Sequence, residues 1–407
     1  MATLSAVYDI IDFTPDDVHL SYLPMPHVFE KLCFCSMIAN GCRIGLYGGE
    51  VLKLKEDLAE LKPTFFPSVP RLFSRMYDVI NGMFREATGV KKSLIQKALA
   101  SKLEHLRKTG SPTHGLWDAL VFKKTKAVLG GRVRMCVTGS APISAEVLDF
   151  LKVCFCSPIL EGYGQTECTG VVTVTSPLDP EAGHVGGPGL HLEMKLEDIP
   201  DMEYLTTDMA EGFPAPRGEV CYRGPAIIKG YFKLPDKTAE AIDSDGWLHS
   251  GDVGLIRPNG SLKIIDRKKN IFKLAQGEYV APEKMENMFT KIPIVAQIFV
   301  HGDSLEAYVV AVVVPDEANL KKWAEAEGKN FDFRDLCGSE DLKKHIQSEI
   351  GKAAKEEGLL GFEIPRNIYV HNEPFTPESD ILTPTFKLKR NIAAKVFRNQ
   401  IDQMYGK

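Results

Sequence analysis

The sequence has no surplus of positive charge. Lysine and arginine together number 49, against 54 aspartates and glutamates, so the net charge is −5. A chain of this kind has no basic field that would attract a phosphate backbone. Nucleic-acid binding is therefore disfavoured.

Long apolar runs are also missing. No window reaches the roughly 18 consecutive apolar residues that a membrane-spanning helix needs. The first residues, MATLSAVYDI, lack a basic stretch followed by a long apolar run. We therefore predict neither a signal peptide nor a membrane anchor here, and we expect the chain to be soluble or peripherally bound.

The cysteines do not form a recognisable framework. There are nine of them, and the close pairs, Cys33/Cys35 and Cys154/Cys156, have the spacing Cys-x-Cys within apolar segments. Structural zinc sites instead use Cys-x-x-Cys, and secreted disulfide scaffolds use even counts. We predict reduced core thiols rather than metal ligands, in a reducing intracellular compartment.

The first part of the chain alternates short β-rich runs with helical patterns. The runs are VHLSYLP, CRIGLYG, PTFFPSV, VRMCVTGSAP and SPILEGYG, and helices are expected at 28–40 and 71–84. Such alternation predicts a parallel sheet covered by helices, with ligands at the carboxyl ends of its strands. We assign residues 1–183 to this α/β subdomain.

The next two regions have a different pattern. Residues 184–265 carry Gly/Pro turns around brief strands (GEVCYRG, AIIKGYF and GSLKIID), which predicts a small antiparallel sheet or barrel. Residues 266–407 combine a strand pair (QIFVHG and AYVVAVVVP) with charged amphipathic helices at 320–327 and 341–357. We assign them to a compact α+β domain that begins at the DRKKN stretch.

Two of the expected parallel strands end in turns of small residues. EGYGQTECTG places Tyr163, Thr166 and Glu167 on a glycine-flexed loop, where a hydroxyl and a carboxylate suit a phosphate and its Mg²⁺. An ordinary polar turn with Glu167 in water is the alternative. In TGSAPIS, Ser140 or Ser144 could simply cap the helix that begins near Ala145. Ser140 is a poor hydrolase nucleophile because the Gly-x-Ser-x-Gly elbow is absent.

Two later stretches carry further candidates. GWLHSGD would expose Asp252 at a turn, where its carboxylate could accept two hydrogen bonds from a vicinal diol such as a ribose. Arg267 could supply fixed donors to the same ribose or to a phosphate. Near the C-terminus, LTPTFKLKR sets Lys387 after a Thr/Pro loop, and a lysine there could reach a phosphate as a point charge. Taken separately, each of these residues is more simply explained as a solvated surface charge.

Together and in this order, the motifs closely resemble the adenylate-forming acyl-CoA synthetases, and among them the eukaryotic long-chain fatty-acid CoA ligases. The resemblance runs from DVHLSYLPMPHVFEK through GGRVRMCVTGSAPIS and EGYGQTECTG to LTPTFKLKR, and Asp245–Lys269 resembles the fatty-acyl-CoA synthetase signature. It implies that a fatty-acid carboxylate attacks the α-phosphate of ATP to give an acyl-adenylate and diphosphate. The CoA thiol then displaces AMP.

The resemblance also implies roles for individual residues. Tyr163 would stack on adenine, Asp252 would hold the ribose hydroxyls and His27 would lie near the acyl carboxylate. The residues implied for the nucleotide and CoA are Gly139, Ser140, Ala141, Pro142, Tyr163, Asp252, Arg267 and Gly277.

Three residues are implied for the chemical step. Thr166 would contact phosphate, Glu167 would hold the Mg²⁺, and Lys387 would steady the charge that develops on phosphate in the transition state. In the family the C-terminal domain swings about a hinge at the residue matching Asp266. That motion would remove Lys387 and bring the segment around Gly277 to the pantetheine channel.

The chain also departs from the family pattern. Relatives carry a Ser/Thr/Gly-rich loop ending in Pro-Lys-Gly that cradles the β- and γ-phosphates, and MATLSAVYDIIDFTP stands in that place. The first α/β half of the adenylate-forming fold is missing as well. We therefore expect a chain cut short at its front, with a weak grip on ATP and a much reduced rate.

Three functional hypotheses follow. The chain is a long-chain fatty-acid CoA ligase that uses ATP, Mg²⁺ and CoA, or it is a noncatalytic module that binds nucleotide or acyl-CoA. The third hypothesis keeps the enzyme class but changes the acid, because luciferases and aryl-CoA ligases share these motifs. Full-length relatives work at the endoplasmic reticulum, the mitochondrial outer membrane or the peroxisome, so a membrane surface could deliver the substrate. The oligomeric state is not visible in the sequence.

Overall fold

The computed structural model describes residues 1–8, 10–50, 53–210, 212–384 and 386–407. Thr385, which belongs to the LTPTFKLKR motif, and Asp9 lie outside these residues. The chain divides into two compact units, each described by itself below. The first unit comprises residues 1–250 and 254–264, and the second comprises residues 251–253 and 265–407.

A seven-stranded sheet organises the first unit, in the order β2-β1-β3-β4-β5-β6-β7. The five strands predicted from the sequence are all present, and neighbours among these five pair in parallel. They are β1 (Val18–Ser21), β2 (Arg43–Leu46), β3 (Phe65–Ser68), β4 (Met135–Thr138) and β5 (Ile159–Tyr163). Two short antiparallel strands, β6 (Thr173–Val174) and β7 (Gly187–Pro188), extend the sheet beyond β5.

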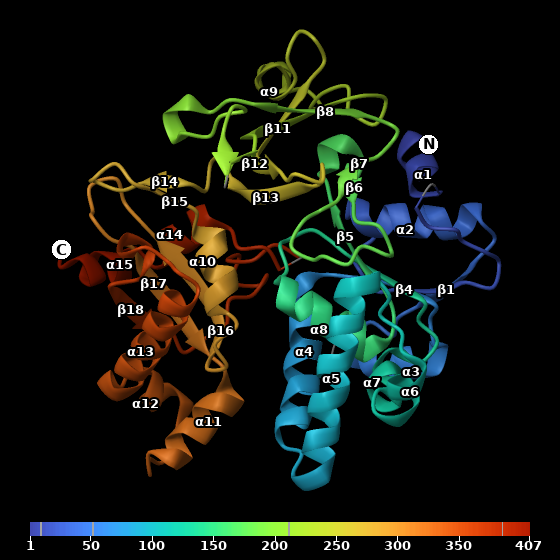
Figure 1. Ribbon diagram of the computed structural model, residues 1–407. Helices are drawn as coiled ribbons and strands as arrows, with labels where there is room; N and C mark the ends of the chain where they lie inside the picture. The colour runs from blue at the N-terminus through green and yellow to red at the C-terminus, as the bar shows by residue number, and fades with distance from the viewer. Residues whose placement is uncertain (9, 51–52, 211, 385) are drawn as a thin grey trace. The chain divides into compact units, whose positions relative to one another are not determined.

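Helices cover both faces of this sheet (Figure 1). Alternate residues of a strand point to opposite faces: Phe65 belongs to the hydrophobic cluster that includes Met37 of α2, whereas Phe66 belongs to the cluster that includes Ile80 of α4 and Leu151 of α8. The helices of this region are α1 (Ala2–Tyr8), α2 (Val28–Ala39), α3 (Leu54–Leu61), α4 (Pro70–Arg85), α5 (Gly89–Thr109), α6 (Gly115–Leu120), α7 (Lys123–Lys126) and α8 (Ala145–Phe155).

An open antiparallel sheet follows, in the order β13-β12-β11-β8. Its strands are β8 (Glu193–Glu197), β11 (Arg217–Arg223), β12 (Leu248–Ile256) and β13 (Leu262–Arg267), accompanied by the hairpin β9 (Met209–Ala210) and β10 (Phe213–Pro214) and by α9 (Pro235–Ala241). The expectation of a barrel-like subdomain is corrected here. In the described part of the chain, β13 and β8 are the two edges of this sheet and do not pair with each other.

The strand expected at AIIKGYF is wrong. Residues 226–232 form turns, bends and irregular backbone; Gly224, just before them, and Gly230, within them, have φ of +153° and +146°. These backbone angles lie in a region that glycine adopts easily and that extended strands do not use. Ile228 instead donates its backbone N–H to the carbonyl of Glu167 at 2.9 Å.

The second unit combines helices with a three-stranded sheet in the order β16-β17-β18. The expected strand pair is β16 (Val295–His301) and β17 (Val310–Pro315), and β18 (Asn367–Val370) joins β17 in parallel. The expected helices are α11 (Glu317–Ala326) and α13 (Glu340–Glu356). The remaining elements are β14 (Phe272–Lys273), β15 (Tyr279–Val280), α10 (Pro282–Phe289), α12 (Phe333–Cys337), α14 (Arg390–Val396) and α15 (Arg398–Tyr405).

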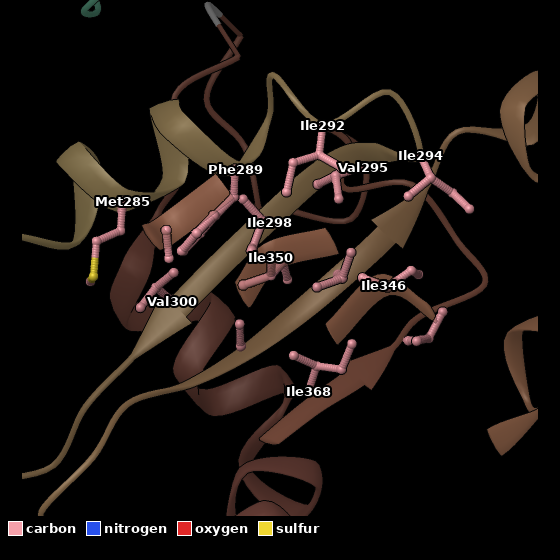
Figure 2. Close-up of a cluster of buried hydrophobic side chains, with 14 of the residues drawn as sticks. Met285, Phe289, Ile292, Ile294, Val295, Ile298, Val300, Ile346, Ile350 and Ile368 are labelled. Carbon is pink, nitrogen blue, oxygen red and sulfur yellow. The ribbon is translucent and has the colours of Figure 1, made fainter. Parts of the chain in front are cut away.

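One face of this sheet carries the largest hydrophobic cluster of the unit. Figure 2 shows Phe289 of α10 and Ile346 and Ile350 of α13 with Ile298 of β16, and all four are buried. Ile346 and Ile350 are four residues apart, so they lie on the same face of α13. Their burial explains why a helix with so many charged residues docks on the sheet.

The cysteines are free thiols. Seven of the nine are buried, as expected of core residues, but Cys42 is half-buried and Cys35 is exposed on α2. The core assignment of Cys35 is therefore wrong, because α2 turns it away from the sheet that buries Cys33. Among the described residues, no helix combines the length and the apolar composition needed to span a bilayer.

Candidate functional site

The turn after β4 adopts a backbone shape that ordinary residues resist. Ser140 has a φ of +75°, which is the left-handed region. Gly139 is buried, and a Cβ added there would lie 3.0 Å from the carbonyl oxygen of Gly162. Ala141 and Pro142 are exposed. The predicted turn thus presents backbone to solvent at the carboxyl end of a buried strand.

The helix after this turn begins as predicted. Ser144 is the N-cap residue of α8, but its side chain makes no capping hydrogen bond to the described backbone. The Ser144 hydroxyl therefore does not cap this helix through a hydrogen bond to the described backbone. The turn that contains Ser140 stands one residue beyond β4, where parallel sheets bind their ligands.

The loop after β5 carries the other candidates of the first unit. Tyr163 ends β5, half-buried, and its hydroxyl accepts a hydrogen bond from the buried Tyr222. Thr166 is exposed, and Glu167 is half-buried with its Oε1 accepting from the Tyr231 hydroxyl at 2.8 Å. Burial, followed by this hydrogen bond, raises the pKa of Tyr231 to about 12, so Tyr231 remains a donor at neutral pH.

These two loops are neighbours because β4 and β5 pair in parallel. Thr138, the last residue of β4, lies opposite Glu161. The segments that follow, Gly139–Pro142 and Gly164–Glu167, therefore leave the sheet at the same edge. The structure brings together the candidate residues of both motifs, which lie more than twenty positions apart in the sequence.

The start of α2 lies beside the second loop. His27 is the N-cap residue of α2, and its Nδ1 accepts a hydrogen bond from the backbone N–H of Phe29 at 3.2 Å. A Cβ added at Gly170 would lie 3.4 Å from the Cγ2 of Val28, so the loop packs against the first turn of this helix. His27 thus caps α2 and also borders the loop that carries Glu167.

A small group of charges in the second unit contains three further candidates. The Asp252 carboxylate is almost fully buried, and its Oδ1 lies 3.4 Å from the Nε of Arg267. The expectation that Asp252 sits at an exposed turn is wrong, because it lies within β12. Gly251, just before it, has a φ of +70°, so the glycine shapes the strand locally without ending it.

Lys387 belongs to the same group. Burial lowers its pKa, the positive charge of Arg267 lowers it further, and the carboxylates of Asp252 and Glu283 oppose that change. Thr383 fixes the backbone of Lys387, because the Lys387 N–H donates to the Thr383 hydroxyl and the Thr383 N–H donates to the Lys387 carbonyl. A lysine with a lowered pKa is still a compact cationic donor for a phosphate.

Phe386, just before Lys387, has a φ of +62°. Glycine adopts this left-handed backbone easily and other residues resist it. The turn that presents Lys387 takes this shape with a phenylalanine, whose side chain is exposed.

Gly277 lies in the exposed turn between β14 and β15. Its φ is +97°, and its N–H donates to the carbonyl of Leu274 at 2.9 Å. A Cβ there would meet only the Lys273 side chain, at 3.8 Å. The left-handed backbone by itself therefore accounts for a glycine at this position, without requiring that the pantetheine arm of CoA passes here.

Sequence reasoning did not predict that several charged residues are buried, including Asp266, which it named only as a hinge position. Glu161 is buried on β5, and burial raises its pKa to about 8. In the second unit Asp266 accepts from the backbone N–H groups of Arg267 and Glu283, and burial raises its pKa to about 7. Glu286 and Arg390 form a buried ion pair across 104 residues, which no local pattern reveals.

The oxygen atoms around Glu167 fit a hard cation. A carboxylate has two oxygens, and Tyr231 binds one of them through a neutral hydroxyl without neutralising the charge. The Thr166 hydroxyl adjoins it on an exposed turn. Such a donor set suits Mg²⁺, which takes oxygen ligands and keeps several of its waters.

Two family models match the chain. The model for the AMP-binding enzyme matches residues 1–232, and the model for the AMP-binding enzyme C-terminal domain matches residues 284–362. The boundary between them falls in the stretch that contains Asp252, Arg267 and Gly277. Both motif loops of the first unit thus lie within the first model, whereas Lys387 lies beyond the second.

The chain is also similar to curated proteins and to solved structures. It is 46% identical to human long-chain-fatty-acid–CoA ligase 1 over 405 residues, which is 100% of this chain but 57% of that protein. It is 46% identical to the peroxisomal long chain acyl-CoA synthetase 7 of Arabidopsis thaliana, covering 97% of this chain and 56% of that protein. The chain therefore spans a little over half the length of the curated relatives it matches.

Two solved adenylation domains share the fold and are more than 25% identical to this chain in sequence. The adenylation domain of the carboxylate reductase from Mycobacterium chelonae has a TM-score of 0.76 and 30% identity, covering 96% of this chain and 54% of that one. The A domain of the carboxylic acid reductase from Segniliparus rugosus, determined in complex with AMP and a co-purified carboxylic acid, has a TM-score of 0.75 and 28% identity. It covers 97% of this chain and 56% of that one.

Proposed function

The chain belongs to the AMP-binding enzyme family, and from this premise we propose that it takes part in the ATP-dependent activation of long-chain fatty acids to acyl-CoA. The carboxylate oxygen attacks the α-phosphorus of ATP and diphosphate leaves, which gives an acyl-adenylate. The CoA sulfur then attacks the acyl carbon and AMP leaves. The observation that carries the proposal is the 46% identity to long-chain ligases along the whole of this chain.

In the first unit, we propose that the paired loops after β4 and β5 bind the nucleotide. Backbone groups of the Gly139–Pro142 turn would contact the base, and Tyr163 would offer its ring for stacking while Tyr222 holds its hydroxyl. The exposed Thr166 would donate to a phosphate. This arrangement supports the proposal because the parallel pairing of β4 and β5 already places both loops at one sheet edge.

We propose that Glu167 holds the Mg²⁺ that accompanies ATP. Bound there, the ion would neutralise charge on the phosphates and polarise them. The chain's own contribution is positional, because Tyr231 fixes one carboxylate oxygen and the Ile228 N–H fixes the Glu167 backbone carbonyl. The half-buried carboxylate is therefore oriented before any ligand arrives.

In the second unit, the proposed roles follow the charge group around Asp252. The Asp252 carboxylate would accept from the ribose hydroxyls, with Arg267 beside it as a fixed donor. Lys387 would donate to the phosphate oxygens as negative charge develops in the adenylation step. Gly277 is proposed to line the path of CoA, and Asp266 to be the hinge of a movement between the adenylation and thioester steps.

The test is diphosphate release by the full chain with ATP, Mg²⁺ and a C16 fatty acid. Lys387→Ala should reduce release by about 10²- to 10³-fold, because one preorganised donor to a transition-state charge is lost. Lys389→Ala is the matched control, since Lys389 pairs with the exposed Asp380 and should keep nearly full activity. Formation of the CoA thioester from acids of different chain length would define the substrate, and a preference for benzoates would exclude the long-chain assignment.

A noncatalytic role, in which the chain binds AMP or acyl-CoA without turnover, is the second candidate. The observation behind it is that the two loops proposed to bind the nucleotide follow paired strands of this chain, and binding by them requires no chemical step. If diphosphate release by the unmodified chain equals that of Lys387→Ala, while AMP or acyl-CoA still binds, this role is supported and the catalytic proposal fails. Association with an endoplasmic reticulum, mitochondrial or peroxisomal membrane remains a proposal for the family member as a whole.

A further inference from the structure

The antiparallel sheet of the first unit carries a cysteine, a histidine and a glutamate on three consecutive strands. Cys221 lies on β11, His249 on β12 and Glu197 on β8. One donor atom from each residue, a sulfur, a ring nitrogen and a carboxylate oxygen, lies within 4.8 Å of the others. We propose that these three side chains bind a divalent transition-metal ion of the zinc class.

The distances agree with the coordination geometry of such an ion. The Cys221 Sγ lies 3.5 Å from the His249 Nδ1. Zinc bonds of about 2.3 Å to sulfur and about 2.0–2.1 Å to nitrogen place two tetrahedral ligands roughly 3.5 Å apart. These two donors therefore already have the separation that a shared metal requires.

The third donor comes from a position that strand pairing fixes. Glu197 lies opposite Glu219 in the antiparallel pair of β8 and β11, and Cys221 follows Glu219 by two residues, so all three side chains share a face. About half of the Glu197 side chain is exposed (48%), so a change of rotamer can bring its carboxylate to the ion. A fourth ligand is at hand, because the Glu219 Oε2 lies 4.0 Å from the His249 Nδ1.

The surrounding charges also favour a cation. The Asp243 carboxylate lies 3.5 Å from the other ring nitrogen of His249, where carboxylates commonly orient metal-bound histidines. The positive neighbour is Lys195, whose Nζ lies 3.3 Å from the Glu197 carboxylate and 4.8 Å from the centre of the Trp247 ring. Because its contact with Trp247 is separate from the ion pair, Lys195 can release Glu197 to the metal and still pack on the ring.

The Cys221 thiol is fully buried beside the other two donor atoms. A nucleophilic cysteine must instead be partly exposed so that a substrate can reach it. A metal ion would instead displace the proton, and the thiolate would then be neutralised by the ion. This donor set with sulfur differs from the all-oxygen set around Glu167, so the two sites select different metals.

Titration of the full chain with cobalt(II) tests the site, because cobalt replaces zinc and reports a bound thiolate by a charge-transfer band in the near ultraviolet. We expect one equivalent to bind with this band and zinc to displace it. Cys221→Ser should abolish the band. Cys35→Ser is the matched control, since Cys35 is exposed on α2, and it should leave the band unchanged.

Two further variants keep the test decisive if Cys221→Ser does not fold. Glu197→Gln changes an exposed side chain and should weaken cobalt binding by at least about tenfold, and His249→Gln should do the same. Absence of the band in the unmodified chain would overturn the proposal. So would a band that survives Cys221→Ser, or one that is insensitive to both Glu197→Gln and His249→Gln. None of these readouts depends on ligase activity.

Discussion

Two carboxylate-bearing regions of the molecule show how differently the same side chain is used. In the first unit Glu167 is half-buried on a loop, and it accepts a hydrogen bond from a neutral tyrosine hydroxyl. In the second unit Glu286 is buried, is paired with Arg390, and accepts from the backbone N–H of Val300 at 2.7 Å. The first carboxylate is oriented but reachable, whereas the second is enclosed by partners of its own unit.

The comparison separates ligand binding from stability. The half-buried Glu167 carboxylate keeps contact with solvent, so its removal should cost the fold little. A side chain that neutralises a buried charge leaves an unpaired ion behind when its partner is removed. Substitutions in the Glu286 region should therefore change the free energy of unfolding, and substitutions near Glu167 should change ligand affinity.

The largest effect is expected from Arg390→Ala. Removing this guanidinium leaves the Glu286 carboxylate buried without its cation, which costs about 3–5 kcal/mol of unfolding free energy. Burial already raises the pKa of Glu286 to about 7, and the charge of Arg390, followed by the backbone N–H of Val300, opposes that change. The destabilisation should therefore be greater at pH 8 than at pH 5.5, where Glu286 is protonated. Urea unfolding at both pH values measures the difference.

Arg398→Ala provides the control for that experiment. Arg398 forms an exposed ion pair with Asp402, four residues along α15, and such pairs contribute little to stability. Its loss should be small and nearly the same at both pH values. Equal destabilisation by Arg390→Ala and Arg398→Ala would show that Glu286 is no more dependent on its cation than an exposed carboxylate is. Glu286 would then no longer differ from Glu167 as a structural carboxylate.

The second prediction concerns Glu161, a buried carboxylate of the first unit whose Oε2 has no hydrogen-bond partner among the described residues. Burial raises its pKa from 4.5 to about 8 in the folded state. Between these values the folded chain holds a proton that the unfolded chain has released, so stability falls as pH rises. The slope for a fully linked group is about 1.4 kcal/mol per pH unit.

Glu161→Gln should remove this dependence, because an amide does not titrate. Urea unfolding at pH 6 and pH 8 should show the unmodified chain losing stability relative to the variant. Glu340→Gln, at an exposed position in the first turn of α13, is the control and should follow the unmodified chain. A Glu161→Gln profile parallel to the unmodified one would show that the buried carboxylate does not govern the pH dependence.

The sequence predicted the fold of the α/β part because its signals are local. Each parallel strand is a short apolar run bounded by turn residues, and β1 to β5 appear where these runs occur. The open sheet was harder, because Gly/Pro turns at short intervals do not reveal whether the edge strands β8 and β13 pair. AIIKGYF has the composition of a strand, yet Gly230 within it and Gly224 before it have positive φ, and the segment forms a loop.

The candidate site was predictable where its residues lie on one turn. Thr166 and Glu167 adjoin each other in the sequence, so the motif alone placed them together. Tyr231 was missed because it lies 64 residues from Glu167, and only folding brings its hydroxyl to that carboxylate. The Glu286–Arg390 pair was missed for the same reason, since no spacing rule applies to two charges on separate elements.

The smallest effect is expected from Tyr231→Phe, and it probes the region where the carboxylate remains reachable. The change removes one hydrogen bond to the Glu167 Oε1 and leaves the ring in place. A hydrogen bond of this kind is worth about 0.5–1.5 kcal/mol, so the affinity for Mg²⁺ and ATP should fall by roughly 2- to 13-fold while urea unfolding changes little. Calorimetric titration with ATP in the presence of Mg²⁺ measures the affinity.

Tyr8→Phe, a change at an exposed tyrosine, is the control for this experiment. If Tyr231→Phe instead lowers stability and leaves affinity unchanged, Tyr231 serves the fold, and Glu167 would then belong with Glu286 as a structural carboxylate.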